Sequence, residues 1–279
     1  MKAAQGTHRS PGDLTGRTLV LVAHGTRNPR GVEIVAKVAE AVAEKVGPTR
    51  VAFVDVLGPS PSEALRQVPG PAVVVPAFLA SGYHVRVDVP TEVEASRHND
   101  VLVTAALGPD PILAEILHER LREAGWRPGD AVVMAAAGSS DDRALGDVGE
   151  AADMLSTLIG APVAVGYVAT AQPRIADVVE KVRRDTGRRV FIATYLLAEG
   201  LFHTKLLAAG ADGVADPIGV HPRLVDLVCA RMGIQDAQST TAMSMRSRFS
   251  RTAPRQWPIN LRPSSLRSSR IAKFVYSSK

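Results

Sequence analysis

The sequence predicts an α/β fold of two tandem doubly wound units, each a four-stranded parallel sheet flanked by helices. Short apolar, β-branched runs alternate with stretches of helical period, which is typical of parallel strands covered by helices on both faces. Several segments also recur roughly 110 to 117 residues later. We expect strands near 18–23, 50–56, 72–78, 101–107, 130–136, 162–169, 189–196 and 213–217.

The segment between the first two strands predicts an amphipathic crossover helix. Within PRGVEIVAKVAEAVAEKVG, valines recur at intervals of three or four residues, and Gly47 ends the periodic run. Right-handed crossovers bring the carboxyl ends of parallel strands to one edge of a sheet, where ligands bind in folds of this class. We therefore expect the functional residues in the loops that follow the strands.

Four segments of the first half have a partner, in the same order, in the second half. The turn-rich GWRPGD at 125–130 separates the two copies. We predict an N-terminal unit at 17–127 that carries the active site, a C-terminal repeat at 128–233, and a tail at 234–279. The matched segments are 18–26 with 131–140, 51–65 with 163–179, 73–89 with 190–206, and 106–117 with 217–228.

The positive charge of the chain is concentrated in its last residues. The 279 residues have a formal net charge of +5, but residues 234–279 carry nine Arg or Lys against one acid, which leaves 24 bases against 27 acids before them. This Ser- and Arg-rich stretch has no sustained period and predicts a disordered basic tail. Two interpretations stay open for it: a dispensable extension, or an arm for RNA or membrane.

Composition restricts the cellular setting. A chain that is 46% hydrophobic can bury a sizeable core. No apolar run is long enough to span a bilayer, and the first residues contain no apolar signal core, so we expect a soluble cytoplasmic protein. The single cysteine, Cys229, has no partner for an internal disulfide and cannot by itself hold an iron–sulfur cluster, so we expect it to be buried in an apolar helix.

Two histidines follow consecutive strands of the first unit. His24 lies in VLVAHGT, and His84 lies in PAFLASGYH, a few residues after its strand ends. Neutral imidazole binds first-row divalent metals and also accepts protons near neutral pH. Metal insertion into a porphyrin-like ring needs both abilities, because the ring loses two N–H protons and the metal must exchange its protein ligands for ring nitrogens. Two histidines with open coordination positions suit this chemistry better than a closed four-ligand site.

The residues after His24 predict an anion-binding corner. Gly25 and Thr26 precede the crossover helix, whose first N–H groups and positive end favour a negative charge. Arg27 and Arg30 add two guanidinium groups to this corner.

Three longer motifs make the chain resemble the sirohydrochlorin chelatases of the CbiX and SirB kind, in their long two-repeat form. The motifs are VAHGTRNP at 22–29, FVDVLGPSPSEAL at 53–65 and PAFLASGYHVRVDVP at 76–90, and the resemblance covers about residues 17–232. It implies a lyase of sirohaem or cobalamin biosynthesis that inserts Fe²⁺ or Co²⁺ into sirohydrochlorin. The metal is then a substrate, and no organic cofactor is needed. The absence of a long histidine-rich stretch, seen in some cobalt-associated relatives, favours iron.

The resemblance also implies roles for individual residues. His24 binds the metal and accepts a proton, and His84 is the second metal ligand. Asp55 stands where the family commonly has a glutamate, so a shorter carboxylate is kept there. Asp88 fits the family pattern as a metal-delivery, capping or loop-bracing residue. The macrocycle-lining stretch is Leu79, Ala80, Ser81, Gly82 and Tyr83.

Sirohydrochlorin carries eight carboxylates, so an acidic protein body must supply positive potential locally. Arg27, Arg30, Arg86 and Arg97 lie in or after the predicted binding loops and are candidates, although solvated surface charge is the alternative.

The second repeat keeps only part of the histidine pattern. Ala137 stands where His24 would be, while His203 in GLFH lies opposite His84. A complete second metal site is therefore not expected. His203 and Lys205 are candidates for enclosing the macrocycle and binding its carboxylates. His221 precedes a proline that opens a helix, as Asp110 does, which favours a helix-start role for both.

Two other function classes compete with a chelatase. A non-catalytic carrier of metal or tetrapyrrole could use the same fold and histidine pair. A nucleic-acid-binding protein could act through the basic tail, but no aromatic residues follow a strand pattern typical of RNA binding, so no nucleic-acid or membrane partner is expected. The oligomeric state is open, and two fused halves are compatible with a monomer.

Deletion of residues 234–279 should separate the tail from the chemistry. We expect the shortened chain to lose any binding to RNA, because the excess positive charge is removed, and to keep its chelatase rate. Gel-shift titration and a metal-insertion assay on both forms would check this, and a slower truncated enzyme would contradict it.

Overall fold

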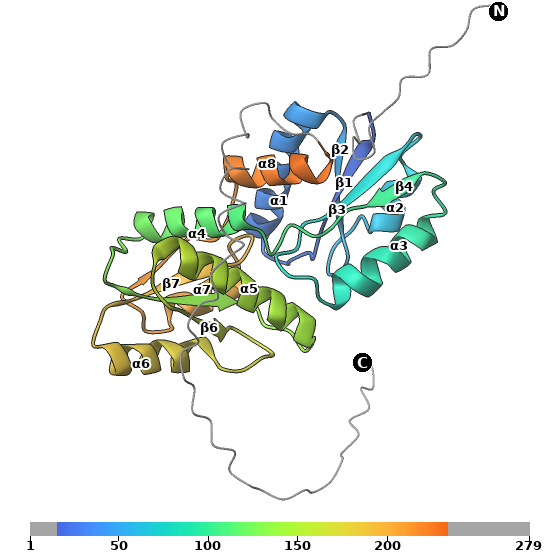
Figure 1. Cartoon of the computed structure of the whole chain (residues 1–279). Coiled ribbons are helices and arrows are strands. Elements are labelled where there is room, and N and C mark those ends of the chain that lie inside the picture. The colour runs from blue at the N-terminus through green and yellow to red at the C-terminus, as the bar shows by residue number, and fades with distance from the viewer. Residues whose placement is uncertain (1–15, 234–279) are drawn as a thin grey trace, which may run out of the picture. The chain divides into compact units, whose positions relative to one another are not determined.

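In this computed structural model, residues 16–233 are described. They form two four-stranded parallel sheets (Figure 1), as the sequence predicts. The strand orders are β2-β1-β3-β4 and β6-β5-β7-β8, so the two halves share one topology. The predicted tail lies outside the described residues. The first half consists of β1 (Thr18–Ala23), α1 (Pro29–Val46), β2 (Thr49–Phe53), α2 (Pro61–Arg66), β3 (Ala72–Pro76), a π-helical turn η1 (His84–Asp88), α3 (Val89–Ser96), β4 (Val101–Val103) and α4 (Pro111–Glu123).

The second half repeats this order from β5 to α8, except that residues 131–231 contain no counterpart of η1. The eight predicted strands are all present, although several are shorter than expected, and the last contains two residues. The elements are β5 (Ala131–Ala136), α5 (Asp142–Ile159), β6 (Val163–Tyr167), α6 (Ile175–Thr186), β7 (Val190–Tyr195), α7 (Leu201–Leu207), β8 (Gly213–Val214) and α8 (Pro222–Arg231).

The predicted crossover helix is α1. Asn28 caps it by accepting a hydrogen bond from the backbone N–H of Arg30, and Pro29 occupies its first position. Its buried side includes Val35, Val38 and Val42, as the valine spacing predicts.

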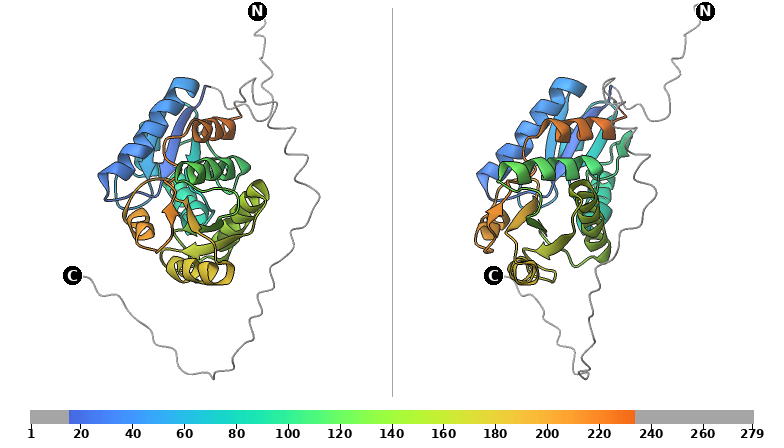
Figure 2. Two further views of the ribbon diagram at one scale, coloured as in Figure 1. Left: turned by 90° about the vertical axis from the view of Figure 1, so that its left-hand side faces the viewer. Right: turned by 60° about the vertical axis from the view of Figure 1, so that its left-hand side comes forward.

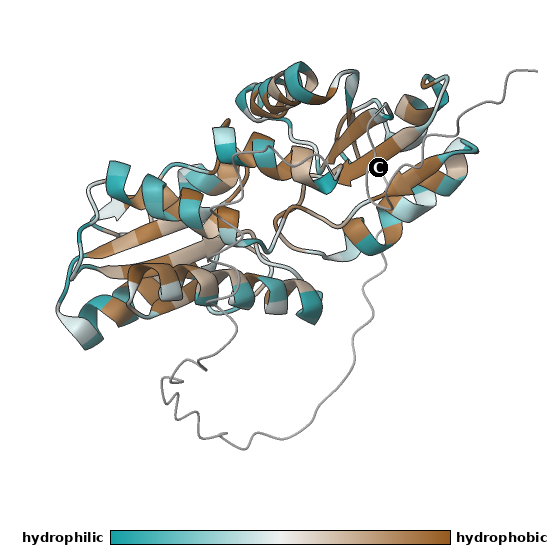
Figure 3. Ribbon diagram, turned by 45° about the horizontal axis from the view of Figure 1, so that its top comes forward, coloured by the Kyte–Doolittle hydropathy of each residue, from teal (hydrophilic) through white to brown (hydrophobic). Residues whose placement is uncertain are grey.

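Side chains of alternate strand residues form the cores on the two faces of each sheet. Leu19 and Leu21 of β1 belong to one cluster of buried residues together with Met134 of β5, whereas Val20 and Val22 belong to a separate cluster. The first cluster therefore joins the two halves. Figure 3 shows the strands as predominantly hydrophobic along their length, as expected for parallel strands covered on both faces.

The last helix of each half packs against the other half. Helix α4 contacts α5 and β7, and α8 contacts α1 (Figures 1 and 2). The Lys45 ammonium of α1 lies 2.6 Å from a carboxylate oxygen of Asp226 in α8. The boundary at 127/128 remains a sequence-based prediction, and the packing of helices crosses it.

Both predicted helix-start residues act as caps. Asp110 accepts a hydrogen bond from the backbone N–H of Ile112 at the start of α4, and the ring of His221 accepts one from Arg223 at the start of α8. The His221 ring also lies 3.0 Å from the Glu119 carboxylate across the two halves. Cys229 is buried in α8, as expected.

The structure changes one part of the predicted repeat alignment. Leu19 pairs with Thr49 in the first sheet, and its counterpart Val132 pairs with Val163 in the second. Thr49 therefore corresponds to Val163, whereas the sequence match places Val51 there. The sequence match is shifted by two residues because the apolar residues of the two strands align equally well in both registers. Only the backbone pairing in the sheets distinguishes the two alignments.

Gly138 and Gly146 provide a test of local backbone constraint in the second half. Gly138 has a φ of 97°, and a Cβ there would lie 2.1 Å from the Ala169 carbonyl oxygen, whereas nothing lies within 4 Å of a Cβ at Gly146 in α5. We expect Gly138→Ala to lower the free energy of unfolding by about 1–3 kcal/mol or more. Gly146→Ala should raise it by about 0.5–1 kcal/mol because alanine favours the helix interior. Chemical denaturation would measure both, and equal effects of the two changes would contradict this account.

Candidate metal and tetrapyrrole site

His24 directly follows β1, at the carboxyl edge of the first sheet. Gly25 next to it has a φ of 99°, and a Cβ there would lie 2.0 Å from the Asp55 carbonyl oxygen. The Asp55 backbone N–H in turn donates to the His24 carbonyl oxygen at 3.0 Å. The two strand-end loops can approach this closely only because residue 25 is a glycine. His24 is exposed at this edge of the sheet.

His84 reaches the same edge from β3 and begins the π-helical turn η1. Its ring Nδ1 lies 2.5 Å from a carboxylate oxygen of Asp88, four residues later. Its ring also stacks on Phe78, with 6.2 Å between the ring centroids. Both contacts orient the imidazole, which is half-buried.

The structure brings the two predicted histidines together. The ring centroids of His24 and His84 are 4.5 Å apart, and the rings are nearly perpendicular, at 84°. The Nδ1 atom of His24 lies 3.1 Å from the Gly25 carbonyl oxygen, while that of His84 faces the Asp88 carboxylate. Both partners accept hydrogen bonds, so in each neutral ring Nδ1 carries the proton and Nε2 keeps the lone pair available to a metal.

The candidate site contains two imidazoles rather than a closed set of ligands. Among residues 16–233, no group of three or more His, Cys, Asp or Glu side chains is placed to hold a metal ion. The predicted residue Asp55 is exposed, and its carboxylate accepts a hydrogen bond from the backbone N–H of Val56 at 2.7 Å. The backbone of Asp55 contacts His24, whereas its side chain accepts a hydrogen bond within its own loop.

The predicted macrocycle-lining stretch joins β3 to His84. Leu79 and Ala80 are half-buried and pack against the core that the two halves share. Ser81 and Gly82 are also half-buried, whereas Tyr83 is 61% exposed and lies next to the His84 ring, at 6.3 Å between ring centroids. Tyr83 is therefore the member of this stretch best placed to meet a bound molecule.

The four candidate arginines differ in their surroundings. Arg27 and Arg97 are exposed. Arg97 directly follows α3 and lies at the opposite edge of the sheet. Arg30 lies 3.3 Å from the Glu199 carboxylate of the second half. Arg86 donates from Nε to the Ser81 carbonyl oxygen at 2.6 Å, so it braces the loop before His84.

Several exposed apolar side chains around the strand-end loops were not singled out by the sequence. Val56 and Leu57 lie in the loop after β2, and Val87 lies in η1. In the second half, Leu201 and Leu207 of α7 are 68% and 63% exposed. The available sequence signal was the apolar character of short segments that follow strands, where polar residues are more common.

The second half repeats the backbone contact between Asp55 and His24 without their side chains. The Ala169 backbone N–H donates to the Ala137 carbonyl oxygen at 2.9 Å, which reproduces the bond from Asp55 to His24. Alanine therefore replaces both the histidine and the aspartate at this edge. The expectation that the second half has no complete second metal site stays a prediction.

His203 is buried, and its Nε2 atom is without a hydrogen-bond partner within residues 16–233. It lines a cavity of about 320 Å³ between the halves, together with Asn28, Arg30 and Glu199. The Lys205 ammonium lies over the Phe202 ring, 5.9 Å from its centroid. A role for His203 and Lys205 in enclosing a macrocycle stays a prediction.

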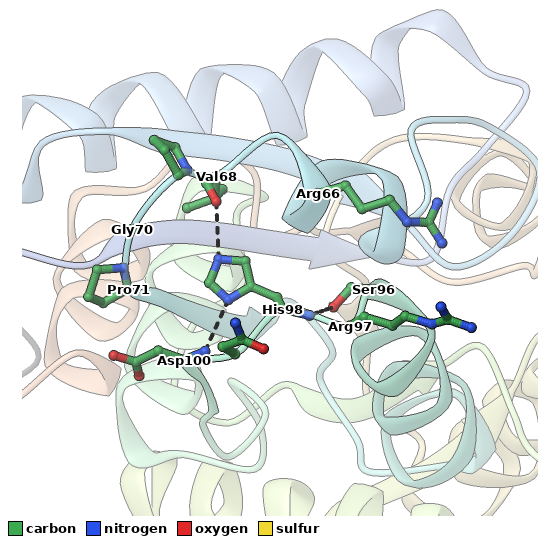
Figure 4. Close-up of a pocket in the computed structure, with 10 residues that line it drawn as sticks. Arg66, Val68, Gly70, Pro71, Ser96, Arg97, His98 and Asp100 are labelled. Carbon is green, nitrogen blue, oxygen red and sulfur yellow. Dashed lines mark hydrogen bonds between the residues drawn. The ribbon is translucent and has the colours of Figure 1, made fainter.

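A second cavity, of about 440 Å³, lies at the opposite end of the first sheet (Figure 4). His98 at its centre uses both ring nitrogens. Nε2 donates to the Val68 carbonyl oxygen, and Nδ1 accepts from the backbone N–H of Asp100. Because this imidazole has neither nitrogen available to a ligand, the cavity does not compete with the paired histidines as a metal site.

Comparison with known proteins finds relatives of both halves of the chain. The CbiX family model matches residues 18–124 and again residues 131–234. A sirohydrochlorin ferrochelatase of Priestia megaterium is 25% identical over 202 residues, which cover 67% of this chain and 76% of that protein. A sirohydrochlorin cobaltochelatase of Methanopyrus kandleri is 31% identical over 139 residues, which cover 38% of this chain and 95% of that protein.

Solved structures share the fold over most of the chain. SirB from Bacillus subtilis with Fe³⁺ superposes with a TM-score of 0.68 at 23% identity, covering 80% of this chain and 96% of that one. The two matches of the family model cover more than half of the sequence, so the chain belongs to the CbiX family. Within residues 16–233, no helix has the length and apolar character needed to cross a membrane.

The pairing of His84 with Asp88 should set the metal affinity of the site. We expect Asp88→Ala to weaken Co²⁺ binding by about 10–100-fold, because the imidazole loses the acceptor that fixes its proton on Nδ1 and its orientation. Calorimetric titration with Co²⁺ would measure the dissociation constant. Glu94→Gln on the exposed side of α3 is the matched control and should bind as the wild type does. Equal affinity of the Asp88 variant would contradict the assigned contact.

Proposed function

We propose that this protein is a sirohydrochlorin chelatase, a lyase that inserts Fe²⁺ or Co²⁺ into the tetrapyrrole sirohydrochlorin. The observation that carries the proposal is the pair of imidazoles 4.5 Å apart at the carboxyl edge of the first sheet, in a chain of the CbiX family. Relatives named for each metal support both alternatives. Imidazole binds both ions, and selection between them follows metal supply more than ligand type.

The two histidines hold the metal substrate through their Nε2 atoms. Two neutral ligands bind an ion weakly enough for ring nitrogens to replace them one after another, whereas a closed four-ligand site would retain it. Asp88 keeps the His84 ring in one orientation, which supports a ligand role. His24, which is more exposed, is the better candidate for proton transfer.

Insertion of one divalent ion releases the two pyrrole N–H protons of the ring. His24 accepts a proton once its Nε2 no longer binds the metal, and passes it to solvent from the exposed edge. The reaction is thus balanced: one M²⁺ enters, and two H⁺ leave, without a redox step or an organic cofactor.

The surroundings of the histidines suit a flat, acidic ring. Exposed Tyr83, Val56 and Leu57 offer apolar contact area for the ring face. Arg27, exposed beside His24, and the first turn of α1 offer positive potential for peripheral carboxylates. The second half, through Leu201 and His203, is the candidate for the other side of the binding region.

We further propose that residues 17–127 form the unit that carries the chemistry and that 128–233 form its supporting repeat. Sirohydrochlorin is the expected partner. A cytoplasmic location follows from this biosynthetic role, and no nucleic-acid or membrane partner is required. The competing role, a carrier of metal or tetrapyrrole, differs in turnover, because a carrier saturates at one equivalent.

Removal of either imidazole should abolish most of the activity. We expect His24→Ala and His84→Ala to lower the rate of metal insertion by at least about 100-fold, since each loses a metal ligand and His24 also loses the base. The change in sirohydrochlorin absorption with Fe²⁺ or Co²⁺ would give the rates over many turnovers.

His118→Ala is the matched control for these variants. This imidazole lies on α4, and its ring centroid is 5.6 Å from that of Trp126. It takes no part in the proposed site. Its loss should leave the rate unchanged. Equal rates in all four proteins would disprove the site, and a wild type that stops at one equivalent would favour the carrier.

A further inference from the structure

The loop that carries His84 is held by side chains of the second half. The Tyr195 hydroxyl, at the end of β7, donates a hydrogen bond to the Leu79 carbonyl oxygen at 2.8 Å, across 116 residues of sequence. The Ser81 backbone N–H donates to a carboxylate oxygen of Asp147 in α5 at 2.7 Å. Two backbone groups within five residues of His84 thus have partners from the other repeat.

The contact at Tyr195 is closely packed. A Cβ at Gly108 would lie 2.2 Å from the Leu79 carbonyl oxygen and 2.6 Å from the Tyr195 hydroxyl, so only glycine fits beside this hydrogen bond. Burial raises the pKa of Tyr195 far above its usual range, and the nearby Asp147 carboxylate adds to this. The phenol therefore remains a donor at all physiological pH values.

The contact at Asp147 continues towards the histidine. Ser81 donates its backbone N–H to Asp147. The carbonyl oxygen of Ser81 accepts a hydrogen bond from Arg86 Nε at 2.6 Å. Arg86 belongs to η1, the same turn as His84 and Asp88. Asp147, Ser81 and Arg86 thus form a continuous chain of polar contacts from α5 to the turn that positions the imidazole.

Neither supporting residue has an equivalent in the first half. In the sheet register, Tyr195 pairs with Ala136, and the corresponding position of the first sheet is occupied by Ala77. The caps Asn28 and Asp141 align α1 with α5, which places Ile34 at the position of Asp147. The two repeats therefore differ in complementary ways: one has the histidines, and the other has the groups that hold their loop.

We propose that Tyr195 and Asp147 are positioning residues for His84, and that the second repeat sets the geometry of a metal site to which it contributes no ligand. The inference rests on the proposed function and extends it. A metal site tolerates little error in ligand orientation, so loss of a backbone hydrogen bond in the supporting loop should weaken metal binding and slow insertion.

Tyr195→Phe removes the hydroxyl that donates to Leu79 and keeps the ring, and Asp147→Ala removes the carboxylate that accepts from the Ser81 N–H. For both, we expect about tenfold weaker Co²⁺ binding, an altered ligand-field absorption of the bound Co²⁺, and a fall of similar size in kcat. The KM for sirohydrochlorin should change less than kcat does, because neither variant removes a side chain that contacts the ring. Asp147→Asn keeps an oxygen acceptor for the Ser81 N–H and should restore most of the affinity.

Thr194→Val is the matched control. Thr194 is buried next to Tyr195, and its hydroxyl donates to the Ala215 carbonyl oxygen at 2.6 Å within the second sheet. This variant also loses a buried hydrogen bond, but it should keep the wild-type Co²⁺ spectrum, affinity and kcat. Thermal unfolding of all variants would identify effects of stability alone.

The outcomes separate this proposal from the proposed function. Tyr195→Phe and Asp147→Ala proteins that match Thr194→Val in Co²⁺ affinity, spectrum and kcat would overturn the positioning role. A wild type that binds Co²⁺ but does not metallate sirohydrochlorin would overturn the function alone. The Co²⁺ titrations without tetrapyrrole would then still decide the positioning role.

Discussion

The apolar core shared by the two sheets is the constraint on which the site depends. Leu19 and Leu21 of the first sheet and Met134 and Phe191 of the second lie in one buried cluster. Burial of the apolar side chains in this cluster stabilises the contact between the sheets more than a few hydrogen bonds do. The core therefore holds the two sheets together. The core also sets the distance between the second half and the His84 loop. Tyr195 and Asp147 form their hydrogen bonds to that loop at this distance.

Exchange of the last helices adds a second link between the halves. Because α4 packs on the second half and α8 on the first, neither half keeps its full set of covering helices when separated. The duplicated chain thus behaves as one structural unit over residues 16–233, and divergence of one repeat can serve the chemistry of the other. Loss of the histidine and aspartate equivalents at Ala137 and Ala169 fits this division of roles.

The chemistry requires a site that binds a metal ion without retaining it. In the proposed function, two imidazoles, each with Nδ1 directed at an acceptor, provide two oriented Nε2 ligands and leave the other coordination positions open. Asp55 stays a candidate for substrate binding, and in this structure its carboxylate accepts a hydrogen bond from the backbone N–H of Val56. The weak ligand set is consistent with transfer of the ion to a tetrapyrrole.

The sequence by itself determined the parallel strands, the duplication and the valine face of α1, and it singled out His24 and His84 as candidates. Hydrophobic period and local motifs depend on neighbours along the chain, so one sequence is enough to read them. Tertiary structure decided the two-residue register of the second strand match and the exchange of α4 and α8. It also placed Tyr195 and Asp147 against the His84 loop. These contacts join residues more than 60 positions apart, and a single sequence contains no periodic signal for such pairs, since they depend on how the sheets and helices pack in three dimensions.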